Sequence, residues 1–273
     1  MFFCPRIFPG FFIFLLMNGE YMEKLELNKV YCMDCIEGMK LLPDNSVDII
    51  ITSPPYNLTT RIKEGRLYNK YDDDLTEEEY YKFIKKVIKE CIRTSRYTFF
   101  NFQILKNNKK VYLQLMSDFK NNIKDIIIWH KKQVQPSIVE TSLSSTFEFV
   151  LVFSDEEESS TKAFSKVNFN NRKKGNLNLN VIYGNNASNK EINSNKNKLN
   201  KATFPQYFVK WFIDKFTQEN SIVMDPFMGS GTTGIVCKLH NRKFIGFDID
   251  ELQVEKAQKH IDSLRTLTQS GWF

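Results

Sequence analysis

Residues 225–234 read Asp-Pro-Phe-Met-Gly-Ser-Gly-Thr-Thr-Gly, and they follow directly on the apolar run of residues 221–224. Three glycines, Gly229, Gly231 and Gly234, fit the spacing G-x-G-x-x-G at a place where a strand turns into a helix. Glycines there let the backbone turn tightly and approach a ligand closely, and the helix N-terminus offers unpaired N–H groups. The stretch therefore predicts a nucleoside-cofactor site, with a Gly-rich turn of no function as the structural alternative.

A carboxylate ends the next predicted strand, residues 243–248. Asp248 follows the glycine-rich stretch at a spacing where a carboxylate can accept hydrogen bonds from both ribose hydroxyls of an adenosine. These residues alone admit any nucleoside cofactor, NAD included.

The rest of the chain alternates short apolar strands with amphipathic helices, which predicts an α/β sheet covered on both faces. The further strands are expected at residues 47–52, 97–102, 126–129, 147–153 and 221–224. One helix is expected after Thr76, which has Glu79 three residues on as in a capping box. The others are expected from Phe204 through Phe216, at residues 232–239, and through Leu252 and Ile261.

A second motif, Thr-Ser-Pro-Pro-Tyr-Asn at residues 52–57, ends the strand at 47–52. Its residue types suit chemistry on an exocyclic amino group, whose lone pair is conjugated into the ring. Acceptors for both amino hydrogens, here the Ser53 side chain and the Pro54 carbonyl, favour a more tetrahedral nitrogen. Tyr56 can stack on the base, an interaction worth roughly 1 to 3 kcal/mol. Taken by itself, a Pro-Pro turn with a core tyrosine is an equally good interpretation.

The composition of the chain favours a globular protein with a polyanionic partner. The 273 residues are 42% hydrophobic and carry a formal charge of +6, which allows one large domain or two small ones. Residues 154–201 are rich in Asn, Lys and Ser, and a disordered linker is the plain interpretation, although the alternation at residues 176–183 predicts some ordered structure. The basic excess lies at residues 165–201, where one acidic residue, Glu191, stands against eight basic ones: Lys166, Arg172, Lys173, Lys174, Lys190, Lys196, Lys198 and Lys201.

Several classes are excluded by what the sequence carries. Five scattered cysteines do not make a disulfide framework and fit a reducing cytosolic location better. Cys32-x-x-Cys35 lacks a second ligand pair, so no metal site is expected. The apolar run at residues 7–17 is shorter than the roughly 20 residues of a membrane-spanning helix, so no membrane partner is expected. Residues 1–21 are interpreted as a leader outside the fold.

Taken together, the two motifs closely resemble the amino-group DNA methyltransferases, which transfer the methyl of S-adenosylmethionine to N4 of cytosine or N6 of adenine. The flanking sequence is also similar, at Cys32-Met33-Asp34-Cys35, at residues 42–48 (Leu-Pro-Asp-Asn-Ser-Val-Asp) and at Thr203-Phe204-Pro205. The resemblance implies a Rossmann-like methyltransferase fold with a mostly parallel seven-stranded sheet and one antiparallel edge strand. Because the catalytic motif precedes the cofactor motif, the order is the circularly permuted one of the β class.

The same resemblance implies the site residues and the domain organisation. Residues 22–153 and 202–273 would form one catalytic domain, and residues 154–201 an inserted target-recognition region that reads double-stranded DNA. The target base would be flipped out of the duplex. A homodimer and a cognate restriction endonuclease are candidate partners. The implied catalytic residues are Ser53, Pro54, Pro55 and Tyr56, and the implied cofactor-binding residues are Asp34, Phe204, Pro205, Asp225, Pro226, Phe227, Gly229, Ser230, Gly231, Thr232, Thr233 and Asp248.

Ser53 bears on the choice of base. Many adenine-specific members of the family read Asp-Pro-Pro-Tyr, whereas Ser-Pro-Pro-Tyr is more frequent in cytosine-N4 enzymes, so we expect N4 of cytosine, with adenine-N6 as the alternative. An RNA or protein methyltransferase, a nicotinamide-dependent oxidoreductase and an inactive DNA-binding protein are rival interpretations of the same residues.

Overall fold

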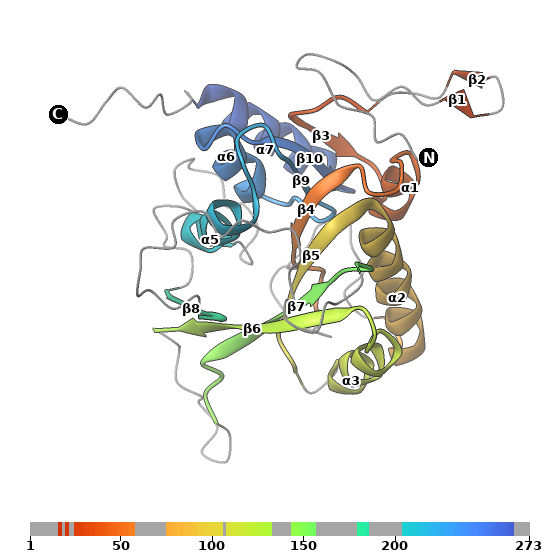
Figure 1. Ribbon diagram of the computed structural model, residues 1–273, viewed down its shortest axis with the longest axis vertical. Coiled ribbons are helices and arrows are strands. Elements are labelled where there is room, and N and C mark those ends of the chain that lie inside the picture. Colours follow the sequence, from red (N-terminus) through yellow and green to blue (C-terminus); the bar gives the residue numbers. More distant parts are fainter. Residues whose placement is uncertain are drawn as a thin grey trace.

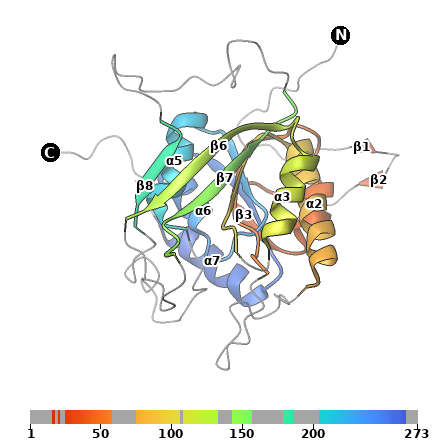
Figure 2. The ribbon, with the colours of Figure 1, turned by 90° about the horizontal axis from the view of Figure 1, so that it is seen from below.

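The computed structural model describes residues 16–17, 20–21, 25–57, 75–105, 108–132, 143–156, 179–185 and 204–264. These residues form an eight-stranded sheet between two layers of helices (Figures 1 and 2). The strands are β3 (Lys29–Cys32), β4 (Val47–Thr52), β5 (Ser95–Phe102), β6 (Ile123–Lys131), β7 (Phe147–Phe153), β8 (Val181–Gly184), β9 (Ile222–Asp225) and β10 (Lys243–Asp248). The helices are α1 (Cys35–Lys40), α2 (Glu77–Thr94), α3 (Lys109–Asp118), α5 (Gln206–Phe216), α6 (Thr232–Leu239) and α7 (Glu251–Ser263).

The strand order is β3-β10-β9-β4-β5-β7-β6-β8. The first five strands of this order, from β3 to β5, pair parallel with one another. Strand β7 is antiparallel to both β5 and β6, and β8 pairs parallel with β6. The mostly parallel α/β sheet is confirmed, but two details of the prediction are wrong. The described part of the sheet has eight strands instead of seven, and the antiparallel strand, β7, lies inside the sheet because it pairs with β5 on one side and with β6 on the other.

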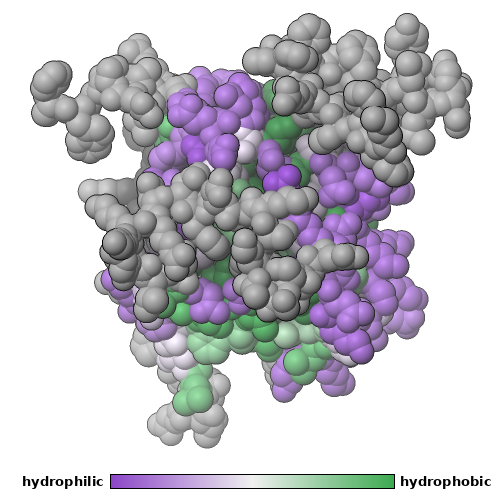
Figure 3. Space-filling model, viewed as in Figure 1, coloured by the Kyte–Doolittle hydropathy of each residue, from purple (hydrophilic) through white to green (hydrophobic). Residues whose placement is uncertain are grey.

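Alternate residues of the central strands face opposite helical layers. Ile50 packs into the apolar cluster that contains α1, α2 and α3, whereas Ile49 and Ile51 pack into the cluster that contains α5, α6 and α7. The near-continuous apolar sequence of β4 follows from this burial on both faces. Figure 3 shows the outer surface over α2 as hydrophilic, as expected for an amphipathic helix that presents one face to the core.

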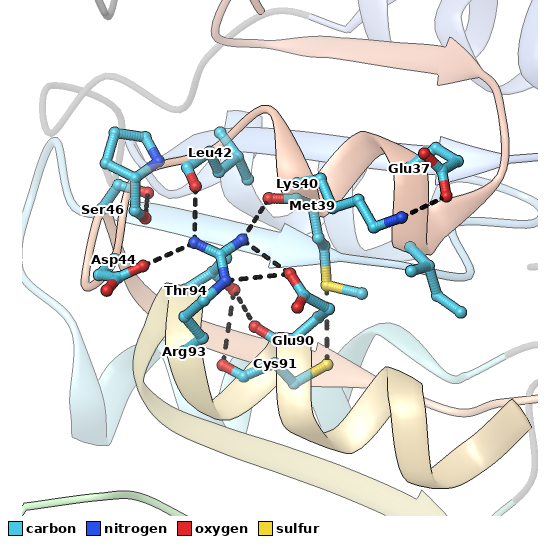
Figure 4. A network of polar contacts seen from close by, with 12 residues as sticks. Glu37, Met39, Lys40, Leu42, Asp44, Ser46, Glu90, Cys91, Arg93 and Thr94 are labelled. Atoms are coloured by element: carbon cyan, nitrogen blue, oxygen red, sulfur yellow. Dashed lines mark hydrogen bonds and ion pairs between the residues drawn. The ribbon is translucent and has the colours of Figure 1, made fainter. Parts of the chain in front are cut away.

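Local signals explain where the first two helices stand. Thr76 and Glu79 form the predicted capping box at the start of α2. At the other end of α2, the Arg93 guanidinium donates to the carbonyl oxygens of Met39 (2.7 Å) and Leu42 (2.9 Å), which lie at the end of α1 (Figure 4). Arg93 also pairs with Glu90, so α1 and α2 are fixed relative to each other just before the chain enters β4.

The structure describes short strands in two regions for which the sequence predicts little regular structure, residues 1–21 and residues 154–201. Leu16–Met17 (β1) and Glu20–Tyr21 (β2) pair with each other and not with the large sheet (Figure 1). The pairing of β8 confirms ordered structure in the segment predicted at 176–183, of which residues 179–183 are described. The eight basic residues at 165–201 lie outside the described residues. No helix in the described part of the chain is long and apolar enough to cross a membrane.

Candidate active site

Four neighbouring parallel strands bring the predicted residues to one edge of the sheet. Asp34 follows β3, Asp248 ends β10, Asp225 ends β9 and Ser53 follows β4. From β4 the chain continues through α2 to β5, and from β9 it continues through α6 to β10 on the other side. The junction of β4 and β9 is therefore the switch point of the sheet, where open α/β sheets form their ligand crevice.

A buried carboxylate joins the two motifs at this switch point. Asp225 is 3% exposed, and its Oδ1 accepts hydrogen bonds from Thr52 Oγ1 (2.9 Å) and from the Phe227 N–H (3.1 Å). Its Oδ2 accepts from Thr233 Oγ1 at the start of α6 (2.8 Å). Burial raises the pKa of Asp225 to about 6, and the hydrogen bonds from Thr233 and Thr52 oppose that shift. The observed contacts of Asp225 and Thr233 are internal to the protein, and their part in cofactor binding stays a prediction.

The glycine-rich stretch turns as its spacing predicts. Gly229 and Gly231 have positive φ angles of 50° and 85°, which side chains rarely allow. A Cβ on Gly234 would lie 2.6 Å from Ile261 Cδ1, so a side chain here would require the end of the Ile261 side chain in α7 to shift. Gly231 is the N-cap of α6 and supplies no side-chain cap. The turn thus places main-chain groups, instead of side chains, at the end of β9.

Asp248 is held by main-chain donors and is partly exposed. Its Oδ2 accepts from the Gly229 N–H (2.9 Å) and its Oδ1 from the Asp250 N–H (2.9 Å). Burial raises the pKa of Asp248. Each carboxylate oxygen can accept more than one hydrogen bond, so this arrangement leaves acceptor capacity for a ligand diol.

The remaining predicted cofactor residues lie around the same edge. Asp34 is exposed and caps α1, accepting from the Ile36 N–H (2.9 Å) and the Glu37 N–H (3.1 Å). Phe204 stacks on Phe208 with ring centroids 4.6 Å apart. Pro205 is the N-cap residue of α5. Pro226 is buried and Phe227 is partly buried. The hydroxyl oxygens of Ser230 and Thr232 lie 3.3 Å apart.

The motif at 52–57 is held rigidly from several sides. Ser53 is partly exposed, and its hydroxyl donates to the Tyr56 hydroxyl (2.9 Å). The Pro55 carbonyl accepts from Tyr80 Oη (2.8 Å) and the Tyr56 carbonyl accepts from Asn108 Nδ2 (3.0 Å). The chain then turns at a positive φ of 55° at Asn57. These contacts fix the backbone that carries Ser53 and the partly exposed ring of Tyr56.

Sequence reasoning missed a group of buried polar residues behind this motif. Glu148 accepts from the Tyr56 hydroxyl (3.1 Å) and from Asn101 Nδ2 (2.6 Å), and it forms an ion pair with Lys131. Burial, with the negative charge of Glu148, raises the pKa of the Tyr56 hydroxyl well above its ordinary value. An acid inside the apolar strand sequence Phe-Glu-Phe-Val-Leu-Val-Phe was the signal that could have identified it. No three His, Cys, Asp or Glu side chains among the described residues are grouped so as to hold a metal ion.

Comparison with known families gives one match across most of the chain. The model of a family described as DNA methylase, of the N6/N4 methyltransferases, matches residues 47–259, a range that includes both motifs. The type II methyltransferase M.HpaI of Haemophilus parainfluenzae is 31% identical over 244 residues, which cover 86% of this chain and 74% of that protein. The type II methyltransferase M.BglII of Bacillus subtilis is 28% identical over 258 residues, covering 86% and 69%.

Solved structures share the fold. PvuII DNA methyltransferase, described as cytosine-N4-specific, superposes with a TM-score of 0.65 at 19% identity and covers 86% of each chain. The complex of M1.HpyAVI with SAM superposes with a TM-score of 0.56 at 20% identity, covering 85% of this chain and 98% of that one. At these identities the likeness concerns the fold alone.

Proposed function

The chain belongs to the N6/N4 DNA methylase family, and from this premise we propose that it transfers the methyl of S-adenosylmethionine to N4 of cytosine in a specific sequence of double-stranded DNA. The observation that carries the proposal is the meeting of the two motifs at the switch point. The Thr52–Asp225 hydrogen bond ties the strand end that carries Ser53 to the strand end that carries the glycine-rich turn. A methyl donor bound at the glycine-rich turn would thereby lie close to a base held at Ser53.

The residues at the carboxyl ends of β9 and β10 fit the adenosine part of such a donor. Asp248 has acceptor capacity for the ribose hydroxyls, and the left-handed glycines leave the main chain open to a close approach. Asp34 would lie near the adenine, and Phe204 with Pro205 would cover the methionine part. When bound, S-adenosylmethionine supplies an electrophilic methyl group on a sulfonium.

Ser53 and Pro54 would prepare the amino nitrogen. The two hydrogens of the cytosine amino group would be accepted by Ser53 Oγ and the Pro54 carbonyl oxygen, which takes the nitrogen lone pair out of conjugation with the ring. The Tyr56 ring would stack on the flipped base, worth about 1 to 3 kcal/mol. The nitrogen then forms its bond to the methyl carbon as the carbon–sulfur bond breaks, and the additional proton leaves the nitrogen for water.

The identity of the target base rests on Ser53. A serine accepts a single hydrogen bond from the amino group and brings no charge, and this residue is the more frequent one in cytosine-N4 members of the family. Adenine-N6 is the alternative. We also propose that residues 154–201 read the DNA sequence, since their basic side chains can pair with phosphates and their asparagines can contact adenine edges in the major groove.

The test is the modified base itself. DNA from a host that expresses the protein is digested to nucleosides and analysed by mass spectrometry, with a host that expresses the Ser53→Ala variant as control. N4-methylcytosine in the first host alone supports the proposal, and long-read sequencing then gives its sequence context. N6-methyladenine would overturn the choice of base, and the absence of both would overturn the function.

A further inference from the structure

Four adjacent strands bring together a group of polar residues, with Asn101 and Glu148 buried, that we name the Glu148 cluster: Ser53, Tyr56, Asn101, Lys131 and Glu148. Ser53 and Tyr56 follow β4, Asn101 is in β5, Glu148 in β7 and Lys131 at the end of β6, and these strands are neighbours in the sheet. The cluster is therefore a product of the topology and not of any local motif.

Glu148 is buried as one member of an ion pair. It is 5% exposed, and the Lys131 ammonium contacts its Oε1, leaving Oε2 for the other members of the cluster. A buried carboxylate without a cation would be strongly disfavoured in its charged form, and here the Lys131 ammonium compensates the charge of Glu148.

An ionised carboxylate fixes the direction of every hydrogen bond in the cluster, because it can only accept. The Tyr56 hydroxyl must donate to Glu148 Oε2 (3.1 Å), so the Tyr56 oxygen is left to accept from its other neighbours. It accepts from Asn101 Nδ2 (2.8 Å) and from Ser53 Oγ (2.9 Å). Ser53 thus uses its only proton inside the cluster, and its oxygen presents lone pairs alone.

The hydrogen bonds of Asn101 are consistent with this direction, although they leave one buried oxygen of Asn101 unpaired among the described residues. Its amide nitrogen donates both hydrogens, to Glu148 (2.6 Å) and to Tyr56 (2.8 Å). Its Oδ1 is buried and has no hydrogen-bond partner among the described residues. Reversing the amide would place Oδ1 against the carboxylate, so the unpaired oxygen is the consequence of keeping both donors on the cluster.

We propose that Glu148 is a positioning residue for methyl transfer: paired with Lys131, it orients the hydrogen bonds through Tyr56 so that Ser53 faces the target amino group as an acceptor and never as a donor. The inference rests on the proposed function, in which Ser53 must accept a hydrogen from the base. Glu148 itself acts through Tyr56 and does not touch the base.

Two double variants separate this role from simple packing. Lys131→Met/Glu148→Met removes the ion pair and the acceptor, which frees the Tyr56 proton to turn toward Ser53. Lys131→Met/Glu148→Gln also removes the ion pair, but its amide oxygen can still accept from Tyr56. Neither leaves an unpaired buried charge, and Met and Gln are close in size. We expect kcat to fall about 10- to 100-fold in the variant with Glu148→Met, the range typical for residues that orient a reacting group, and distinctly less in the variant with Glu148→Gln.

A double-mutant cycle with Tyr56→Phe tests whether Glu148 acts through the Tyr56 hydroxyl. In the Tyr56→Phe background, Met and Gln at position 148 should give equal rates, because the link to Ser53 is already absent. Equal rates of the two double variants in the presence of Tyr56 would overturn the proposal, as would an undiminished difference in its absence. The matched control is Asp118 at the end of α3, a carboxylate that likewise accepts from a tyrosine hydroxyl, that of Tyr81, and forms an ion pair with a lysine, Lys85. Asp118→Leu and Asp118→Asn should both transfer methyl at the wild-type rate.

A measurement without DNA keeps the proposal separate from the proposed function. In protein labelled with ¹³C at tyrosine Cζ, the Tyr56 resonance, assigned by its loss in Tyr56→Phe, should shift in Lys131→Met/Glu148→Met and stay unchanged in Asp118→Leu. An unshifted resonance overturns the inference whatever the activity. A shifted resonance in a protein that methylates no DNA leaves the cluster established and overturns the proposed function.

Discussion

Asp225 offers a quantitative test of the electrostatics at the switch point. Its carboxylate is buried and accepts hydroxyl and N–H groups, and it forms no ion pair with a described residue. Replacing it by Asn keeps the shape of the side chain. The Asn Oδ1 can accept from Thr52 and the Phe227 N–H, and its Nδ2 can donate to Thr233.

The magnitude follows from the pKa. Burial raises the pKa of Asp225 from 3.8 to about 6 in the folded protein. Between pH 3.8 and about pH 6, Asp225 is therefore protonated in the folded state and ionised in the unfolded state. The protonated form stabilises the fold fully below about pH 4, and this stabilisation is lost as the pH rises to about 6. A shift of about two units corresponds to about 3 kcal/mol. The amide of the variant does not titrate. The unfolding free energy of Asp225→Asn minus that of wild type should therefore increase by about 3 kcal/mol as the pH rises from 4 to 7.

The assay is urea unfolding of both proteins at several pH values between 4 and 7.5. Other carboxyl groups titrate in both proteins, so their contributions cancel in the difference between the two unfolding free energies. A difference that stays constant over this range would refute the assignment of a raised pKa to Asp225. A difference that grows as the pH falls would show that the carboxylate is instead stabilised in its charged form.

Three further substitutions test separate parts of the structure. Ser53→Ala should slow methyl transfer to DNA at least about 100-fold in a tritium assay, because it removes an acceptor of the amino group, while calorimetry shows unchanged binding of S-adenosylmethionine; a wild-type rate would remove Ser53 from the reaction. Arg93→Met should lower the unfolding free energy by about 3 kcal/mol, since it deletes charged hydrogen bonds to two carbonyl oxygens at the end of α1, and a loss below about 1 kcal/mol would contradict this reasoning. Lys173→Gln/Lys174→Gln should weaken DNA binding and reduce the slope of log affinity against log salt by about 2, as measured by fluorescence anisotropy, and an unchanged slope would exclude phosphate contacts by these lysines.

The bounds of elements with a strong local sequence signal were predictable, whereas the position of a strand in the sheet, which depends on its pairing with other strands, was not. The bounds of β4, β7, β10 and α6 agree with the sequence pattern, because apolar runs, prolines and glycines mark their ends. The place of β7 between β5 and β6 has no local signal, since the same apolar strand would suit an edge or the interior of a sheet. β3 has only four residues, of mixed exposure, and was not predicted.

The candidate site divides in the same way. The glycine turn and the Ser53 motif are contiguous in sequence and carry their chemistry in their residue types. Glu148 is 92 positions from Tyr56, and nothing near either residue indicates that they meet. Such a contact depends on the antiparallel insertion of β7 between β5 and β6, whereas the antiparallel strand was expected at the edge of the sheet.

The motif at 52–57 lies between two buried carboxylates whose environments differ. On the β9 side Thr52 donates to Asp225, which has hydroxyl and N–H partners and a raised pKa. On the β7 side Tyr56 donates to Glu148, which has Lys131 as a fixed counter-ion. A carboxylate held only by neutral donors is destabilising at neutral pH, and its charge is best compensated by a cationic ligand. A carboxylate with its own lysine needs no ligand and gives a constant hydrogen-bond direction. The proposed roles follow from this contrast: the β9 side suits a positively charged methyl donor, and the β7 side keeps Ser53 ready for an uncharged base.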